Sequence, residues 1–256
     1  MGRLSAVALP ALPEVEPGAD LGALIADAWR LAGASEPELA PKSGDVLVVT
    51  QKIVSKAEGQ MVDLRTVEPR PEAVEFAAAW ERDARQVEVV LREAAEVLRM
   101  ERGLVICRTH HGFVCANAGV DASNSGGADV VTLLPRDPDA SAVALRNRLR
   151  DLLGVDVAVV ISDSFGRPWR FGIVDVALGV AGLAPLDDQR GRPDADGRIM
   201  HSTIVAVADE ICSAAELAAG KVSRQPVVLV RGVDLGSGEG SVGGDVVMPR
   251  DFDLFR

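Results

Sequence analysis

Two aspartates follow apolar segments at points where a side chain could meet a ligand. Asp163 comes near the end of VAVVISDS, and Asp121 lies in AGVDASN. Carboxylate oxygens are preferred ligands of Mg²⁺ and Mn²⁺, and two carboxylates can hold one metal ion or a pair that bridges phosphate oxygens. Each aspartate taken singly also suits an Asx-type turn. The two segments together favour a metal and phosphate site, and the turn interpretation stays open.

Basic side chains accompany both segments. Lys52 and Lys56 lie in QKIVSKAEG (51–59), and Arg167 and Arg170 lie in FGRPWR. Lysine acts as a point charge on phosphate, and arginine can hold a phosphate or carboxylate through two N–H groups. The chain has neither a Walker A loop nor a GxGxxG turn after a strand, so no standard phosphate loop supports nucleotide binding. Solvated lysines are the simpler alternative, and the sequence does not choose between the arginines.

Histidine and cysteine give weaker signals. His110 and His111 precede Gly112 in a predicted turn, which is slight evidence for metal binding or acid–base chemistry. The cysteines lack CxxC spacing, which indicates free thiols in a reducing compartment rather than a zinc site. They are Cys107, Cys115 and Cys212.

The composition of the chain limits its partners. Its 256 residues are 48% hydrophobic and 25% charged, as in an ordinary globular protein, and the net charge is −11. A field of that sign repels nucleic acid and anionic membranes, so anionic substrates would require local cations. No apolar stretch reaches membrane-spanning length and the N-terminus does not read as a secretory signal, which predicts a cytoplasmic protein.

Short strands and helices that alternate irregularly must position these residues. The pattern predicts a mixed α/β (α+β) fold that is not Rossmann. A continuous helix is expected over 71–100, where Trp80, Ala84, Val87 and Leu91 recur at steps of four and three. The polar stretch 51–59 is expected to be a loop. Further helices are predicted at 20–33, 139–153 and 209–220, and strands at 44–50, 130–135, 155–164, 202–208, 226–232 and on both sides of Gly112.

Six segments, in order, resemble the coenzyme F420-0:L-glutamate ligase family in its stand-alone form. They are ALPEVEPGADL, GDVLVVTQKIVSKAEGQ, GFVCANAGVDASN, VAVVISDSFGRPWRFG, VAVADEICSAAELAAGK and PVVLVRG, and the resemblance runs from about residue 7 to residue 232. It implies a two-lobed fold, a single ligase domain over residues 1–256, and a homodimer. It also implies a GTP-dependent enzyme with Mg²⁺ or Mn²⁺, and K⁺ as an additional cation. Such an enzyme joins L-glutamate to F420-0 through an acyl phosphate, and then adds γ-linked glutamates.

The resemblance also implies roles for individual residues. The metal ligands would be Asp121, Asp163 and Ser164, and Lys56 would join the two aspartates in catalysis. The nucleotide contacts would be Ala11, Leu12, Pro13, Glu14, Gln51, Lys52, Ser55, Lys56, Asn124 and Lys221. Two positions depart from the family pattern: ALPE stands where GLP is usual, and Lys221 stands where some members carry a carboxylate. A metal-dependent phosphohydrolase or a non-catalytic GTP-binding protein would use the same residues.

Overall fold

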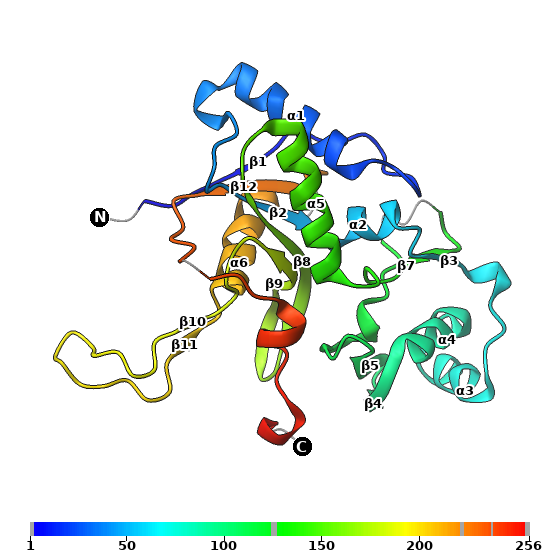
Figure 1. The fold of residues 1–256 in the computed structure, drawn as a ribbon. Coiled ribbons are helices and arrows are strands. Elements are labelled where there is room, and N and C mark those ends of the chain that lie inside the picture. Colours follow the sequence, from blue (N-terminus) through cyan, green and yellow to red (C-terminus); the bar gives the residue numbers. More distant parts are fainter. Residues whose placement is uncertain (1–2, 124–126, 221–222, 237, 254–256) are drawn as a thin grey trace.

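The fold centres on a mixed five-stranded sheet in the order β1-β12-β2-β8-β9 (Figure 1). The computed structural model describes residues 3–123, 127–220, 223–236 and 238–253. The strands are β1 (Ser5–Ala8), β12 (Val227–Arg231), β2 (Val46–Thr50), β8 (Ala158–Arg167) and β9 (Arg170–Ala181). β2 and β8 run parallel and the other neighbours are antiparallel. This sheet confirms the mixed α/β prediction and differs from a parallel Rossmann sheet.

Helices cover both faces of this sheet (Figure 1). α1 (Leu21–Ser35) and α5 (Pro138–Leu153) pack on one face, and α6 (Val207–Ala219) packs on the other. Successive side chains of a strand point to opposite faces. Leu47 and Val49 of β2 therefore join the core beneath α1 and α5, whereas Val46 and Val48 join the core beneath α6. This two-sided burial explains why β2 reads as a continuous apolar run.

A second lobe is formed by residues 61–133 and has its own apolar core. β3 (Met61–Asp63) pairs with β7 (Val130–Thr132), and a separate sheet has the order β4-β5-β6. Two helices, over residues 71–80 and 84–93, pack with this sheet around the apolar core of this lobe (Figure 1). The remaining elements of the lobe are α3 (Pro71–Trp80), α4 (Ala84–Glu93), β4 (Ala94–Glu101), β5 (Leu104–Thr109), β6 (Val114–Ala116) and the 3-10 turns η2 (Leu64–Thr66) and η3 (Asn117–Gly119).

Short elements connect and extend the two lobes. α2 (Gln51–Ala57) follows β2 directly, and η1 (Pro37–Leu39) follows α1. β10 (Asp187–Asp188) and β11 (Ile204–Val205) form the base of an arm that projects from the body (Figure 1). The C-terminal part contains η4 (Val242–Val246) and η5 (Arg250–Phe252). Within the described parts of the chain, no helix has the length and apolar character to cross a membrane.

The prediction of one helix over 71–100 is wrong. α3 ends where Glu81 takes a left-handed conformation with φ of 52°, and Asp83 begins α4 by accepting a hydrogen bond from the Arg85 amide at 2.8 Å. Residues 94–101 then form β4, paired with β5. The apolar residues recur at steps of three and four across both the junction between α3 and α4 and the junction between α4 and β4. Only the tertiary pairing with β5 makes residues 94–101 a strand.

Three smaller predictions also need correction. The expected loop at 51–59 contains helix α2. In the expected strand at 202–208, only Ile204–Val205 is a strand, and α6 begins at Val207. The strand at 155–164 was expected to end in a polar turn near Asp163, but β8 continues to Arg167 because β9, which the sequence analysis did not predict, pairs with it. The helices at 20–33, 139–153 and 209–220 and the strands at 44–50 and 226–232 are confirmed within a few residues.

Candidate metal and phosphate site

Asp163 lies where strands β2 and β8 meet the start of helix α2. β2 runs beside β8 up to the pair Thr50 and Ser162, and at Gln51 the chain turns into α2. Asp163 is the next residue of β8 and is half-buried. The β2–α2 junction therefore places the first turn of α2 next to this carboxylate, as expected at the carboxyl end of parallel strands.

The electrostatic surroundings of Asp163 are unfavourable to its charge. Burial, with the nearby carboxylates of Asp175 and Asp121, raises the pKa of Asp163 to about 7, against the opposing effects of the Ser164 amide and Lys52. A carboxylate with a perturbed pKa beside other carboxylates is typical of a functional site. A divalent cation near these groups would relieve the repulsion and favour the ionised form.

Asp121 is held by its own backbone and by the following turn. Its amide donates to the carbonyl oxygen of Thr132 at 3.0 Å, and its carbonyl accepts from the Thr132 amide at 2.8 Å. The Ser123 amide donates to Asp121 Oδ1 at 2.7 Å and the Ser123 hydroxyl donates to Oδ2 at 2.9 Å. The Asx-type turn is therefore present at Asp121. It holds the carboxylate in place and is compatible with a role of Asp121 as a metal ligand.

Lys52 connects α2 to this carboxylate. Its Nζ lies 2.6 Å from Asp121 Oδ2 and donates to the carbonyl oxygen of Ser123 at 2.7 Å and to its Oγ at 2.9 Å. Burial disfavours the charge of Asp121, but the bonds from Lys52 and Ser123 outweigh it and lower the pKa of Asp121. The ammonium occupies a position on Asp121 where another cation could bind.

Lys56 lies one turn further along α2 and on the same face as Lys52, since residues four apart on a helix are neighbours. It forms an ion pair with Glu14, and its own side chain is only 8% exposed. The hydrogen bond and charge of Lys56, with a smaller contribution from Arg224, lower the pKa of Glu14. Lys56 therefore contacts the predicted segment from Ala11 to Glu14 through Glu14, and Arg224 lies close enough to act on the charge of Glu14.

The remaining predicted nucleotide contacts fall into three groups. Ala11 and Pro13 are exposed and Leu12 is half-buried in the same loop as Glu14. Gln51 and Ser55 are buried and bonded to each other, with the Ser55 hydroxyl donating to Gln51 Oε1 at 2.9 Å, so the structure does not bring them to the surface. The last two predicted contacts lie outside the described residues. They are Asn124 and Lys221.

Ser164 has a partner that the sequence did not reveal. Its hydroxyl donates to Asp175 Oδ1 at 2.5 Å, and Asp175, directly across the β8–β9 hairpin, is only 7% exposed. No pattern in the sequence marks Asp175, because only the pairing of the two strands brings it opposite Ser164. Arg224 was not singled out either, since its proximity to Glu14 depends on the tertiary structure.

The other candidate groups lie away from the contacts that hold Asp121, and two of them, His111 and Arg167, each bury a side-chain nitrogen (Nδ1 and Nε) that has no hydrogen-bond partner among the described residues. His111 Nε2 is 2.9 Å from the carbonyl oxygen of Pro135, and its ring stacks on Phe113. Arg167 and Arg170 pair in register next to the turn of the β8–β9 hairpin. All three cysteines are free and buried. Burial, together with Cys107 and Asp163, raises the pKa of Cys115 to about 12, so this thiol near Asp163 stays protonated.

The aspartates fit a divalent metal that completes its shell with phosphate and water. The described residues contain no group of three or more His, Cys, Asp and Glu side chains able to hold a metal ion. Mg²⁺ is commonly bound by only one or two carboxylates together with substrate phosphates. Asp121, already bound to the Lys52 ammonium, and Asp163, whose charge other carboxylates oppose, have the chemistry for such a site.

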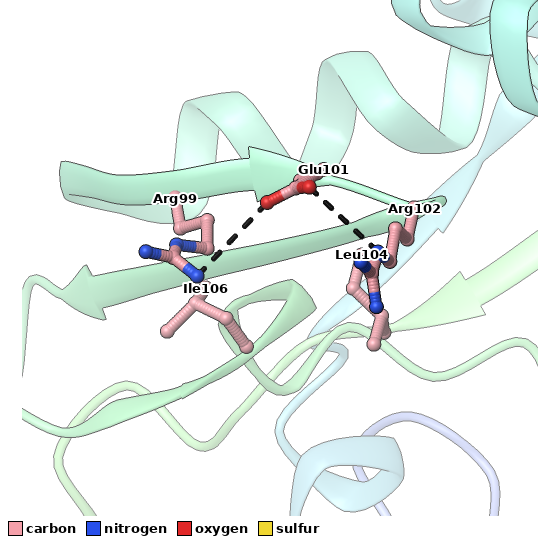
Figure 2. Close-up of a pocket in the computed structure, with 5 residues that line it drawn as sticks. All are labelled: Arg99, Glu101, Arg102, Leu104 and Ile106. Atoms are coloured by element: carbon pink, nitrogen blue, oxygen red, sulfur yellow. Dashed lines mark ion pairs between the residues drawn. The ribbon is translucent and has the colours of Figure 1, made fainter.

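Two cavities lie away from these aspartates. Figure 2 shows a hollow of about 300 Å³ on the β4–β5 hairpin, where Arg99 and Arg102 flank Glu101 above Leu104 and Ile106. The second, of about 220 Å³, lies between the start of α1, the end of α2, and α5. Neither is lined by Asp121 or Asp163. The chemical groups, rather than cavity volume, therefore locate the candidate site.

Comparison with known proteins identifies the family. The model of the F420-0:gamma-glutamyl ligase family matches residues 11–232, which include both aspartates and α2. The chain belongs to this family. It is therefore a ligase, and the predicted resemblance is confirmed.

Relatives from three archaea have similar lengths. A coenzyme F420:L-glutamate ligase of Methanothermobacter thermautotrophicus is 40% identical over 99% of this chain and 99% of its own. One of Methanopyrus kandleri is 44% identical over 91% of this chain and 90% of its own. One of Methanocaldococcus jannaschii is 40% identical over 84% of this chain and 86% of its own. The likeness thus covers both lobes rather than a single motif.

Proposed function

We propose that the chain joins L-glutamate to coenzyme F420-0 in F420 biosynthesis, with GTP and Mg²⁺ or Mn²⁺, and then adds further γ-linked glutamates. Family membership and the names of the relatives support the substrates. One observation carries the metal and nucleotide: Lys52 of α2 pairs with Asp121 and acts on the charge of Asp163, and Lys56 follows one turn later on the same face of the helix, where it pairs with Glu14. Carboxylates beside paired lysines suit a metal-bound phosphate.

The reaction requires activation of a carboxylate. An oxygen of the F420-0 carboxylate attacks the γ-phosphorus of GTP, which forms an acyl phosphate and releases GDP. The glutamate amine then attacks the acyl carbon, phosphate leaves, and the nitrogen loses a proton to give the amide. Phosphoryl transfer depends mainly on positioning and neutralisation of charge. Lys52 and Lys56 would hold phosphate oxygens, and Asp121 and Asp163 would hold the metal, which neutralises charge on the phosphates.

Several further properties belong to the same proposal. A homodimer is supported by large apolar side chains exposed near the turn of the β8–β9 hairpin, where Trp169 is 84%, Phe171 105% and Ile173 55% exposed. Light scattering of the purified protein would test it. Free cysteines support a cytoplasmic location. K⁺ as an additional cation and a single domain over residues 1–256 stay predictions.

Mass spectrometry of the reaction products tests the ligase proposal. Purified protein with F420-0, GTP, Mn²⁺ and glutamate should yield products heavier by one or more glutamyl units. Asp121→Asn and Asp163→Asn should each lower turnover by at least about 100-fold, the order expected when one group that stabilises transition-state charge is lost. Asp151→Asn, an exposed site on α5, is the matched control.

Other products would contradict the proposal. Release of phosphate that needs neither glutamate nor F420-0 would favour a metal-dependent phosphohydrolase. Binding of GTP without any product would favour a non-catalytic GTP-binding protein. Turnover equal to the unmodified protein in both aspartate variants would refute the proposed metal ligands.

A further inference from the structure

The side chain of Lys52 is bound to Asp121, which the proposed function takes as a metal ligand. Its ammonium nitrogen contacts three oxygens within 2.9 Å: Asp121 Oδ2, the Ser123 carbonyl oxygen and Ser123 Oγ. This cluster of a carboxylate, a carbonyl and a hydroxyl resembles the oxygen ligands that hard divalent cations prefer. Lys52 comes from a different element, α2, so its position on these oxygens is not imposed by the turn that holds Asp121.

One ammonium cannot balance the charges around it. Asp121 and Asp163 are two carboxylates, and Asp175 adds a third whose charge reaches Asp163. A divalent cation bound between the first two would neutralise them fully. It would also repel the adjacent ammonium, because like charges a few ångströms apart repel strongly in a half-buried site. Metal binding and the Lys52–Asp121 ion pair therefore compete for the same carboxylate.

We propose that Lys52 is an internal counter-ion of Asp121 that the divalent metal displaces, and that the released ammonium then binds a phosphate of the nucleotide. The inference rests on the proposed function, since it takes Asp121 as a metal ligand. In this proposal Lys52 couples metal binding to nucleotide binding. Before the metal binds, Lys52 is held on Asp121 and is not available to phosphate.

The geometry of α2 gives the released side chain a destination. Lys52 and Lys56 lie one helical turn apart on the same face, so a lysine that leaves Asp121 is beside a second cation. Two ammonium groups side by side repel unless an anion lies between them. Glu14 already pairs with Lys56, and a nucleotide phosphate would supply the anion that Lys52 lacks once it leaves Asp121. Metal and nucleotide should therefore bind cooperatively, each strengthening the other by the same factor.

Binding of Mn²⁺ in the absence of nucleotide tests the exchange directly. We expect Lys52→Gln to bind Mn²⁺ about three- to tenfold more tightly than the unmodified protein, because the competing ammonium is gone. Free Mn²⁺ measured by electron paramagnetic resonance reports this affinity without any need for turnover. Lys52→Arg keeps the charge and should keep the weaker binding. A variant that merely damages the fold would bind Mn²⁺ less tightly, which is the opposite direction.

Lys56→Gln is the matched control. It removes the same charge from the same face of α2, but Lys56 pairs with Glu14 rather than Asp121. An equal gain in Mn²⁺ affinity in Lys52→Gln and Lys56→Gln would mean that the loss of one positive charge, and not the release of Asp121, caused the gain. That result would overturn the exchange of Lys52 for the metal on Asp121. Unchanged or weaker Mn²⁺ binding in Lys52→Gln would overturn it as well.

Addition of GDP tests the coupling. In the unmodified protein GDP should tighten Mn²⁺ binding, and in Lys52→Gln this enhancement should shrink by at least about threefold, since the lysine no longer links the two sites. An undiminished enhancement would overturn the coupling role. Failure of the proposed function looks different: Asp121→Asn and Asp163→Asn would then bind Mn²⁺ as the unmodified protein does.

Discussion

Replacement of Asp163 by asparagine should stabilise the metal-free protein while it abolishes metal binding. The pKa of Asp163 is about 7 in the folded chain, compared with an ordinary value of 3.8, because burial and the carboxylates of Asp175 and Asp121 oppose its charge. Asparagine has nearly the same shape and carries no charge. It therefore removes the repulsion without opening a cavity.

The magnitude follows from the two pKa values. They differ by about 3 units (7 minus 3.8), and each unit corresponds to about 1.4 kcal/mol, which sets an upper limit near 4 kcal/mol. Since the folded state holds the Asp163 proton more tightly, the contribution of Asp163 to stability is most favourable below pH 3.8 and is lost as pH rises through about 7. Asp163 is half-buried, so solvent screening reduces the effect to about 2–3 kcal/mol.

Thermal unfolding in EDTA at a series of pH values provides the assay. The advantage of Asp163→Asn should be small near pH 4, grow as pH rises, and level off above pH 7, where it corresponds to a Tm higher by roughly 5–10 °C. Mn²⁺ at pH 8 should raise the Tm of unmodified protein and leave that of Asp163→Asn unchanged. Asp151→Asn reports the effect of removing an exposed charge. A variant that is less stable than unmodified protein at pH 8 in EDTA would refute the reasoning.

Two further predictions concern the scaffold, and urea unfolding measures both. Asp45→Ala should lower the free energy of unfolding by about 3–5 kcal/mol, because Asp45 is 2% exposed and binds Arg231 through both carboxylate oxygens at 2.6 Å; a loss below 1 kcal/mol would contradict this. Asp139→Ala should cost about 2–4 kcal/mol, because its carboxylate accepts three backbone N–H bonds, from Val180, Val242 and Gly243, each at 2.9 Å; Asp139→Asn, which keeps an acceptor, should cost less.

Local sequence patterns predicted much of the main sheet. β2, the buried start of β8, and β12 were expected because valine-rich runs bounded by polar or glycine residues favour buried strands. α1 and α5 have side-chain caps, from Asp20 and Asp137, at the start of their amphipathic spacing. These signals are contained within a dozen residues, so they can be read without the rest of the chain.

The second lobe was predicted less well for the same reason. The apolar spacing over 71–100 satisfies a helix throughout, and the switch to a strand after Glu93 depends on pairing with β5. The strand β9 likewise depends on β8 as its partner. Strand pairing joins residues that are distant in sequence, and a local pattern contains no information about that partner.

The surroundings of Asp121 and Asp163 show what the sequence determined and what the tertiary structure decided. The sequence by itself determined the types of group, two aspartates and two lysines in the order of a ligase family, and the six segments that contain them, taken in order, were enough to predict the family. Only the tertiary structure decided that Lys52 rests on Asp121, that Asp175 faces Ser164, and that Gln51 and Ser55 are buried against each other. Those contacts join α2, β8, β9 and the second lobe, and their energies depend on distance and burial, which the linear order of residues does not specify.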